Sequence, residues 1–213
     1  KNSSYDLVAK MKSGEIDILL GTQMVSKGFD FHRVSVVGVL LADIGLSLPD
    51  FRASERIYAL LTQVAGRCGR GEAKGRVVVQ TLNAGNEMLK FLTRHDYDGF
   101  ADFELSLRKA LAYPPFARLA RVLVRGKHDR KVIEAADSLA RAMRAEIERT
   151  GSPVSILGPA PAPLEKIAAN FRHHLILKSA DAAAIRSLIS SCRSAAAGGG
   201  LYLEIDIDPS DML

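Results

Sequence analysis

Hydrophobic residues follow two patterns along the first half of the chain. Continuous apolar runs of about four to eight residues are typical of buried strands, whereas apolar residues that recur every three or four positions indicate amphipathic helices. Because the two kinds of segment alternate, the pattern favours an α/β fold with a parallel sheet. Strands are predicted at 16–20, 34–41 and 77–81, and helices at 4–13, 22–27, 55–70, 87–94 and 97–111.

The second half follows a different order, which begins after the stretch YPPF at 113–116. Two consecutive prolines cannot continue a helix, so we place a domain boundary here and predict domains at 1–112 and 113–213. The later segments have the order βαββαβ, which is the split arrangement of ferredoxin-like domains. Strands are predicted at 119–124, 154–157, 173–178 and 201–207, helices at 129–149 and 181–196, and a proline-rich bend at 158–163.

Composition changes this picture only in part. The 213 residues carry a net charge of +5, which is compatible with a polyanionic partner without identifying one. No apolar run reaches the roughly 20 residues that a membrane-spanning helix needs. Cys68 and Cys192 lie far apart, with no Cys or His at metal-ligand spacing, so we expect no metal site, no disulfide framework and a reducing cytoplasm. The chain opens without methionine, and we expect it to be a piece of a longer protein.

The stretch QVAGRCGR is the first candidate site. Helical spacing puts Gln63, Arg67 and Arg70 on one face, opposite apolar residues that should pack inward. Guanidinium groups on a fixed scaffold suit a phosphate, and Gly66 and Gly69 leave room for a bulky anion. The alternative is a solvated basic helix end, where arginine complements the helix dipole.

The stretch GTQMVSKG is the second candidate site. It follows the strand predicted at 16–20, and ligands of open α/β sheets bind where the strands end. Lys27 has the plain alternative of a surface lysine. Asp43 follows the next strand and either faces this edge or caps a turn, while Asp50 and Arg52 in the LPDFR loop have no assigned role. The candidates of this stretch are Gly21, Thr22, Gln23, Lys27 and Gly28.

Basic residues in the second half form a third candidate site, suited to backbone phosphates of nucleic acid. Phe171 either stacks on a base or packs in the core. The adjacent His173 and His174 have no carboxylate or cysteine at ligand spacing, which favours structural roles. The candidates are Arg118, Arg121, Arg125, Lys166, Phe171, Arg172 and Lys178.

Two stretches of the chain resemble motifs V and VI of superfamily 2 helicases, and their sequences are similar to those of the PriA family of replication-restart helicases. The stretches are GTQMVSKG and LPDFRASERIYALLTQVAGRCGRG. GPAPAP, FRHHLILK and IDIDP extend the resemblance over nearly the whole chain. It implies an ATP-dependent 3′-to-5′ DNA helicase, with a RecA-like second helicase lobe in residues 1–112 and a ferredoxin-like C-terminal domain that binds DNA or protein in residues 113–213.

The resemblance also implies roles for single residues. Gln63, Arg67 and Arg70 would reach the γ-phosphate of ATP, with Arg70 as the arginine finger, while the GTQMVSKG residues would contact both nucleotide and DNA backbone. Arg186 is the candidate for binding a partner, the acidic tail of the single-stranded-DNA-binding protein.

Other parts of the expected machinery would lie outside this chain. No GxxxxGK[ST] stretch occurs here, so the lobe that cradles ATP and Mg²⁺ must lie elsewhere and the fragment alone should be inactive. The family's zinc-binding cysteines precede motif V. Implied partners are branched and single-stranded DNA and other primosome proteins at the nucleoid, with no membrane. The alternatives are a non-catalytic DNA- or protein-binding module and another superfamily 2 translocase.

Overall fold

The computed structural model describes residues 4–22, 34–66, 75–196 and 198–212. The fold is α/β and divides into two compact units. Unit 1 comprises Lys1–Leu48 and Arg52–Asp102, and unit 2 comprises Pro49–Phe51 and Phe103–Leu213. Within the described residues, unit 1 holds a small parallel sheet and unit 2 holds an antiparallel one. None of the described helices is long and apolar enough to cross a membrane.

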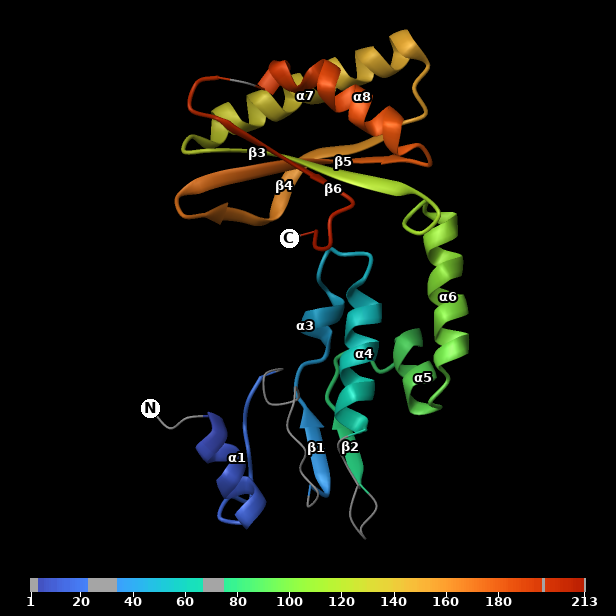
Figure 1. Ribbon diagram of the computed structural model, residues 1–213, viewed down its shortest axis with the longest axis vertical. Helices are drawn as coiled ribbons and strands as arrows, with labels where there is room; N and C mark the ends of the chain where they lie inside the picture. The colour runs from blue at the N-terminus through green and yellow to red at the C-terminus, as the bar shows by residue number, and fades with distance from the viewer. Residues whose placement is uncertain (1–3, 23–33, 67–74, 197, 213) are drawn as a thin grey trace. The chain divides into compact units, whose positions relative to one another are not determined.

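Unit 1 is built around two parallel strands, with Val37 of the first paired to Val77 of the second. Their positions confirm the predicted strands at 34–41 and 77–81 in shorter form. The last helix of the unit continues into unit 2. In chain order (Figure 1) the elements are α1 (Ser4–Ser13), β1 (Val36–Val39), α3 (Asp43–Leu46), α4 (Ala53–Ala65), β2 (Arg76–Val79), α5 (Glu87–Thr93) and α6 (Tyr97–Ala110).

An aromatic core fixes α4 in unit 1. The ring of Tyr58 lies parallel to that of Phe100, with centroids 4.2 Å apart. Tyr58, Leu61 and Phe100 are buried together, and Val39 and Val79 of the two strands pack against this cluster. Offset aromatic pairs add to the stabilisation from burying their area. The buried residues hold α4 in a fixed orientation within the unit.

Two expectations for the first half of the chain are wrong. Residues 16–20 form no strand, and Ile18 and Leu20 expose 77% and 85% of their surface. A strand needs a neighbour to satisfy its backbone groups, and no described residue pairs with this run. In the helix predicted at 97–111, helical spacing predicts that Phe100, Phe103, Leu107 and Leu111 pack in the core. Phe100 is buried, but Leu107 and Leu111 are exposed, because the described core of unit 2 is built against other helices.

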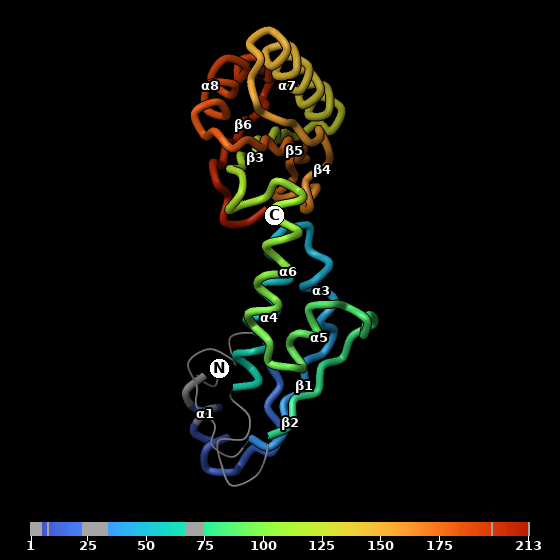
Figure 2. The backbone as a smooth tube through the Cα atoms, turned by 90° about the vertical axis from the view of Figure 1, so that its right-hand side faces the viewer, coloured from blue at the N-terminus to red at the C-terminus, as the bar shows by residue number. Residues whose placement is uncertain are grey.

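Unit 2 is a four-stranded antiparallel sheet in the order β4-β5-β3-β6. Its two long helices lie on the same face of that sheet (Figure 1 and Figure 2). The register is set by pairs such as Val122 with Leu175. The elements are β3 (Arg118–Gly126), α7 (Asp129–Thr150), β4 (Ser155–Ile167), β5 (Asn170–Ser179), α8 (Ala182–Cys192), a short 3₁₀ helix (Arg193–Ala196) and β6 (Tyr202–Ile207).

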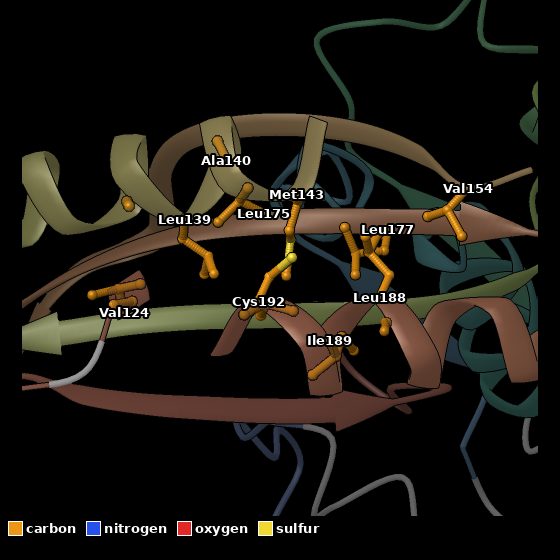
Figure 3. Close-up of a cluster of buried hydrophobic side chains, with 14 of the residues drawn as sticks. Val124, Leu139, Ala140, Met143, Val154, Leu175, Leu177, Leu188, Ile189 and Cys192 are labelled. Carbon is orange, nitrogen blue, oxygen red and sulfur yellow. The ribbon is translucent and has the colours of Figure 1, made fainter. Parts of the chain in front are cut away.

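The core of unit 2 fills the space between this sheet and its helices (Figure 3). Strand side chains alternate between faces, so every second residue of β3 points toward the helices. Helix residues at spacings of three and four meet them from the other side. The fully buried contributors include Val122, Val124, Leu139, Met143, Leu175 and Leu177.

The predicted proline-rich bend is instead part of β4. This strand runs from Ser155 to Ile167 with register shifts after Leu157 and Pro161. Proline is tolerated here because β4 is an edge strand, where missing N–H groups need not meet a partner. Gly158 makes the first shift possible, since its φ is +95° and a Cβ would lie 2.8 Å from the carbonyl oxygen of His174.

Candidate functional site

The described end of α4 presents Gln63 to solvent. Tyr58, Leu61 and Val64 are buried on the other side of the helix, which is the amphipathic arrangement that the spacing predicts. Among the described residues, none hydrogen-bonds the side-chain amide of Gln63. Gly66 ends the helix, and a Cβ there would lie 3.6 Å from the nearest described atom. The other candidates of this stretch, Arg67, Gly69 and Arg70, lie outside the described residues.

Few residues of the GTQMVSKG stretch can be placed. Gly21 and Thr22 are exposed and belong to no described helix or strand. Gln23, Lys27 and Gly28 lie outside the described residues. The roles proposed for this stretch therefore remain predictions.

Asp43 lies where the two parallel strands of unit 1 end. One carboxylate oxygen accepts a hydrogen bond from the Thr81 hydroxyl and the other accepts one from the backbone N–H of Leu82, both at 2.8 Å. The Leu82 N–H, followed by the Thr81 hydroxyl, holds the pKa of Asp43 below its ordinary value. Of the two alternatives that the sequence left open for Asp43, the structure therefore supports the one in which it faces the sheet edge. Its hydrogen bonds join the segment after β2 to the start of α3.

The arginines of β3 face carboxylates on the neighbouring strand β6 and on Asp208, the residue that follows it. Arg121 lies opposite Asp206 in the strand register, and their charged groups are 3.8 Å apart. Opposite charges in such cross-strand positions attract and stabilise the pairing. Arg125 also lies over the ring of Tyr202, with its guanidinium carbon 4.6 Å from the centroid. The ion pairs along the two strands, here called the β3–β6 ladder, are Arg118–Asp208, Arg121–Asp206 and Arg125–Glu204.

Sequence reasoning missed these carboxylates. The signal was present, because Glu204, Asp206 and Asp208 occupy every second position of YLEIDID and such alternation puts them on one strand face. What the sequence did not reveal was that β6 pairs with β3. Because of the ladder, three of the predicted DNA-binding arginines are already paired with a carboxylate.

Three more of the basic candidates are engaged within unit 2. Lys166 lies 4.4 Å from the ring centroid of Phe171, which itself packs against the core. Arg172 is only 8% exposed and donates to the carbonyl oxygen of Leu164 at 2.9 Å. The Lys178 ammonium donates to the carbonyl oxygen of Leu111 at 2.7 Å. Burial lowers the pKa of both Arg172 and Lys178. The DNA-binding assignment is untested by these contacts, but a ligand would have to compete with them.

His174 lies within this basic group without a partner for one ring nitrogen. Its Nδ1 is buried and has no hydrogen bond among the described residues. Burial, followed by the nearby charges of Arg121, Arg172 and His173, lowers the pKa of His174. A protonated imidazole would add a cation to a group that is already positive. The structure therefore favours the neutral ring.

The stability of unit 2 should depend on this histidine. The unfolded chain binds a proton near the ordinary pKa of about 6.5, whereas the folded chain binds it only at lower pH. The extra proton held by the unfolded state makes folding stability fall as the pH drops below about 6.5. Replacing His174 with leucine should flatten this dependence, which urea denaturation at pH of about 7.5 and 5 measures. His128→Gln, at an exposed position, is the control that should keep it; an unchanged slope in the leucine variant would contradict the assignment.

Arg186, the partner-binding candidate, is exposed on α8, and its side chain makes no hydrogen bond or ion pair with a described residue. Among the residues that the structure describes, no group of three His, Cys, Asp or Glu side chains is arranged to hold a metal ion. The described candidates thus separate into Gln63 and the sheet edge in unit 1, and the basic strands with Arg186 in unit 2.

Comparison with known proteins gives one consistent family. Residues 109–210 match the family described as the Primosomal protein N C-terminal domain. Over 208 residues, covering 96% of the chain, it is 38% identical to the replication restart protein PriA of Treponema pallidum. The corresponding protein of Borreliella burgdorferi is 33% identical over the whole chain, and that of Bacillus subtilis is 38% identical over 84% of it.

The chain is much shorter than these relatives. It spans 31%, 32% and 22% of the proteins from T. pallidum, B. burgdorferi and B. subtilis respectively. The matches include both units, since each of the first two covers at least 96% of the chain. By this similarity the chain belongs to the family of the replication restart protein PriA.

Proposed function

We propose that this chain is the C-terminal part of an ATP-dependent 3′-to-5′ DNA helicase that recognises branched DNA and initiates primosome assembly in replication restart. The observation that carries the proposal is the exposed amide of Gln63 at the end of a helix that an aromatic core holds in place. In this proposal unit 1 is the second RecA-like lobe. Unit 2 is a ferredoxin-like domain, supported by its strand order β4-β5-β3-β6 and by two helices on one face.

Two described features support a contact with the γ-phosphate end of a nucleotide. Gln63 is free of described partners, and packing alone does not require glycine at position 66. Gln63, Arg67 and Arg70 would hold the γ-phosphate, with the GTQMVSKG residues beside them. Bound ATP with Mg²⁺ supplies the phosphoryl group. The arginines would stabilise the negative charge that develops on its oxygens during transfer.

Turnover would need residues outside this chain. The phosphate-cradling lobe, the magnesium carboxylates and the zinc-binding cysteines belong to the remainder of the full-length protein in this proposal, and the fragment alone would be inactive. The arginines could stabilise a transition state only when the phosphate-cradling lobe holds ATP in position beside them. In this proposal the activity belongs to the complete protein, which would act in the cytoplasm at the nucleoid.

Unit 2 would supply the contacts to branched and single-stranded DNA. Its basic groups lie along strands β3 and β5. DNA phosphates would replace the carboxylates of the β3–β6 ladder as partners of the arginines. Arg186 would bind the acidic tail of the single-stranded-DNA-binding protein, which its lack of a described partner supports. Other primosome proteins would bind in the same assembly.

The test is ATP-dependent separation of forked DNA by the full-length protein. We expect strand separation with ATP and none with a non-hydrolysable analogue, while forked DNA is bound in both cases. Binding without separation under every condition would favour a non-catalytic DNA- or protein-binding module. Separation of strands with 5′-to-3′ polarity would contradict the proposed direction. The match at residues 109–210 speaks against a different superfamily 2 translocase.

A further inference from the structure

Tyr202 is an exposed aromatic residue on the sheet of unit 2. It begins β6, and 56% of its surface is exposed. The next residue, Leu203, packs against the core beneath α7 and α8, and successive side chains of a strand point to opposite faces. Tyr202 therefore lies on the open face of the sheet, the face away from these two helices (Figure 1). Among the described residues it belongs to no core cluster, so burial does not account for an aromatic ring at this position.

Two arginines lie in the same row of the sheet as Tyr202. In the strand register Tyr202 pairs with Arg125 of β3, which in turn pairs with Arg172 of β5. Directly paired residues share a face, so the three side chains form one row across the open face. Neighbouring strands are about 4.8 Å apart, which makes this row roughly 10 Å long. The guanidinium carbon of Arg125 lies 4.6 Å from the Tyr202 centroid, so the ring and the cation are in contact.

Lys127 adds a positive charge beside this row. It follows Gly126, the last residue of β3, where a Cβ would lie 2.7 Å from the side chain of Leu201. The end of β3 therefore lies close against the start of β6. Lys127 is exposed and forms no ion pair with a described residue, whereas Arg125 is already paired with Glu204. An anion can bind the Lys127 ammonium without displacing a carboxylate.

An exposed ring flanked by cations combines the two features that bind single-stranded nucleic acid. Every base has a π-face that can stack on an aromatic side chain, and basic groups bind the phosphates on either side of it. A base is uncharged, so it can lie on a ring near Glu204, whose carboxylate would repel a phosphate. Bases within a duplex are already stacked and paired, so leaving the duplex costs free energy that an unpaired base does not lose. The ligand that fits Tyr202 is therefore an unpaired base.

We propose that Tyr202 is a stacking platform for an unpaired base of single-stranded DNA, with Lys127 and Arg125 binding the adjoining phosphates. The inference rests on the proposed function, and it names the part of the DNA that unit 2 would contact at this end of β6. Tyr202 is absent from the candidates that the sequence provides, because the pairing of β6 with β3 puts its ring beside Arg125.

Replacing Tyr202 with alanine in the 213-residue chain tests the stacking. Two probes are compared, a short oligothymidine and an abasic oligonucleotide of the same length. Tyr202→Ala should bind the oligothymidine about tenfold more weakly, which is the loss of one stacked base. Its affinity for the abasic probe should stay within about twofold of the wild type, because that probe offers phosphates alone. Tyr202→Phe keeps the ring and should keep the affinity, and Phe116→Ala, which removes another exposed ring of unit 2, should have no effect.

Salt dependence separates the ring from the charges. The loss of one phosphate contact to a single strand reduces the slope of log K against log salt by about 0.7. We expect this reduction in Lys127→Ala and an unchanged slope in Tyr202→Ala. A smaller slope in Tyr202→Ala would argue against the proposal, because the variant would then have disturbed the charges and not a stacked base.

Tryptophan fluorescence reports on the same contact directly. The chain contains no tryptophan, so Tyr202→Trp puts a single indole at the site. The oligothymidine should quench its fluorescence and the abasic probe should not, while the indole of Phe116→Trp should respond to neither. Quenching of the same size by polyglutamate would assign the ring to an acidic protein partner and would overturn the proposal.

The outcomes distinguish this inference from the proposed function. Equal affinity for the oligothymidine in the wild type and in Tyr202→Ala would exclude the stacking role and leave DNA binding by unit 2 intact. A wild-type chain that binds neither probe at low salt would contradict DNA binding by unit 2, and the stacking role with it.

Discussion

Alanine in place of Arg70 should reduce ATP hydrolysis by the full-length protein about a thousandfold or more. The prediction follows from the proposed role of this arginine, whose fixed charge and planar fork would stabilise the γ-phosphoryl oxygens in the transition state. Affinity for forked DNA should stay within about twofold, since the DNA contacts come from other residues. Steady-state phosphate release and DNA binding, measured on the same preparation, check both parts.

Two further variants sharpen this test of Arg70. Arg70→Lys keeps the charge but loses the fork that contacts two oxygens, so it should recover little of the activity. Arg94→Ala removes an exposed arginine after α5 in the same unit and should leave turnover unchanged. Wild-type turnover in Arg70→Ala would exclude the arginine-finger role.

The second large effect is expected in the core of unit 2. Leu139 on α7 is fully buried among the side chains drawn in Figure 3. Replacing it with alanine removes apolar contacts and leaves a cavity, which should cost about 3 kcal/mol of the free energy of unfolding. The loss should appear in unit 2, because Leu139 contributes to no core cluster of unit 1.

The measurement for Leu139 must report on unit 2 alone, since a chain with two compact units need not unfold in one step. Hydrogen exchange of the β3 and β5 amides at increasing urea concentrations serves this purpose. Ile133→Ala is the matched control, because this residue lies on the same helix but is 37% exposed and should cost less than about 1 kcal/mol. Equal losses in the two variants would show that α7 is not packed as described.

The sequence predicted most elements because their patterns are local. The spacing of apolar residues along α7 and the alternation in β3 require no knowledge of a partner, and both elements lie where they were expected. The run at 16–20 failed because an apolar pattern does not reveal whether another strand is beside it. The prolines of β4 misled for a related reason, since the sequence does not say that this strand lies at an edge.

The candidate sites also contain some features that local sequence predicts and others that depend on residues far away in the chain. Helical spacing predicted the burial of Leu61 and Val64, and the structure places Gln63 on the open face. Ile57 and Leu60, predicted on the same apolar side, are only half-buried, and Tyr58 is buried instead. The role of Asp43 required the position of Thr81, which lies far away in the sequence. The loop containing Phe51 could not be assigned, because nothing in its own residues indicates the unit to which it belongs.

The β3–β6 ladder has a consequence for ionic strength. A polyanion gains affinity by shedding its condensed sodium ions when protein cations replace them. The guanidinium of Arg125 already forms an ion pair with Glu204, so the net positive charge that faces an incoming phosphate is smaller. Binding of the polyanion should therefore release fewer sodium ions. The sheet should consequently hold polyanions less tightly than a count of its arginines implies, with a shallower response to added salt.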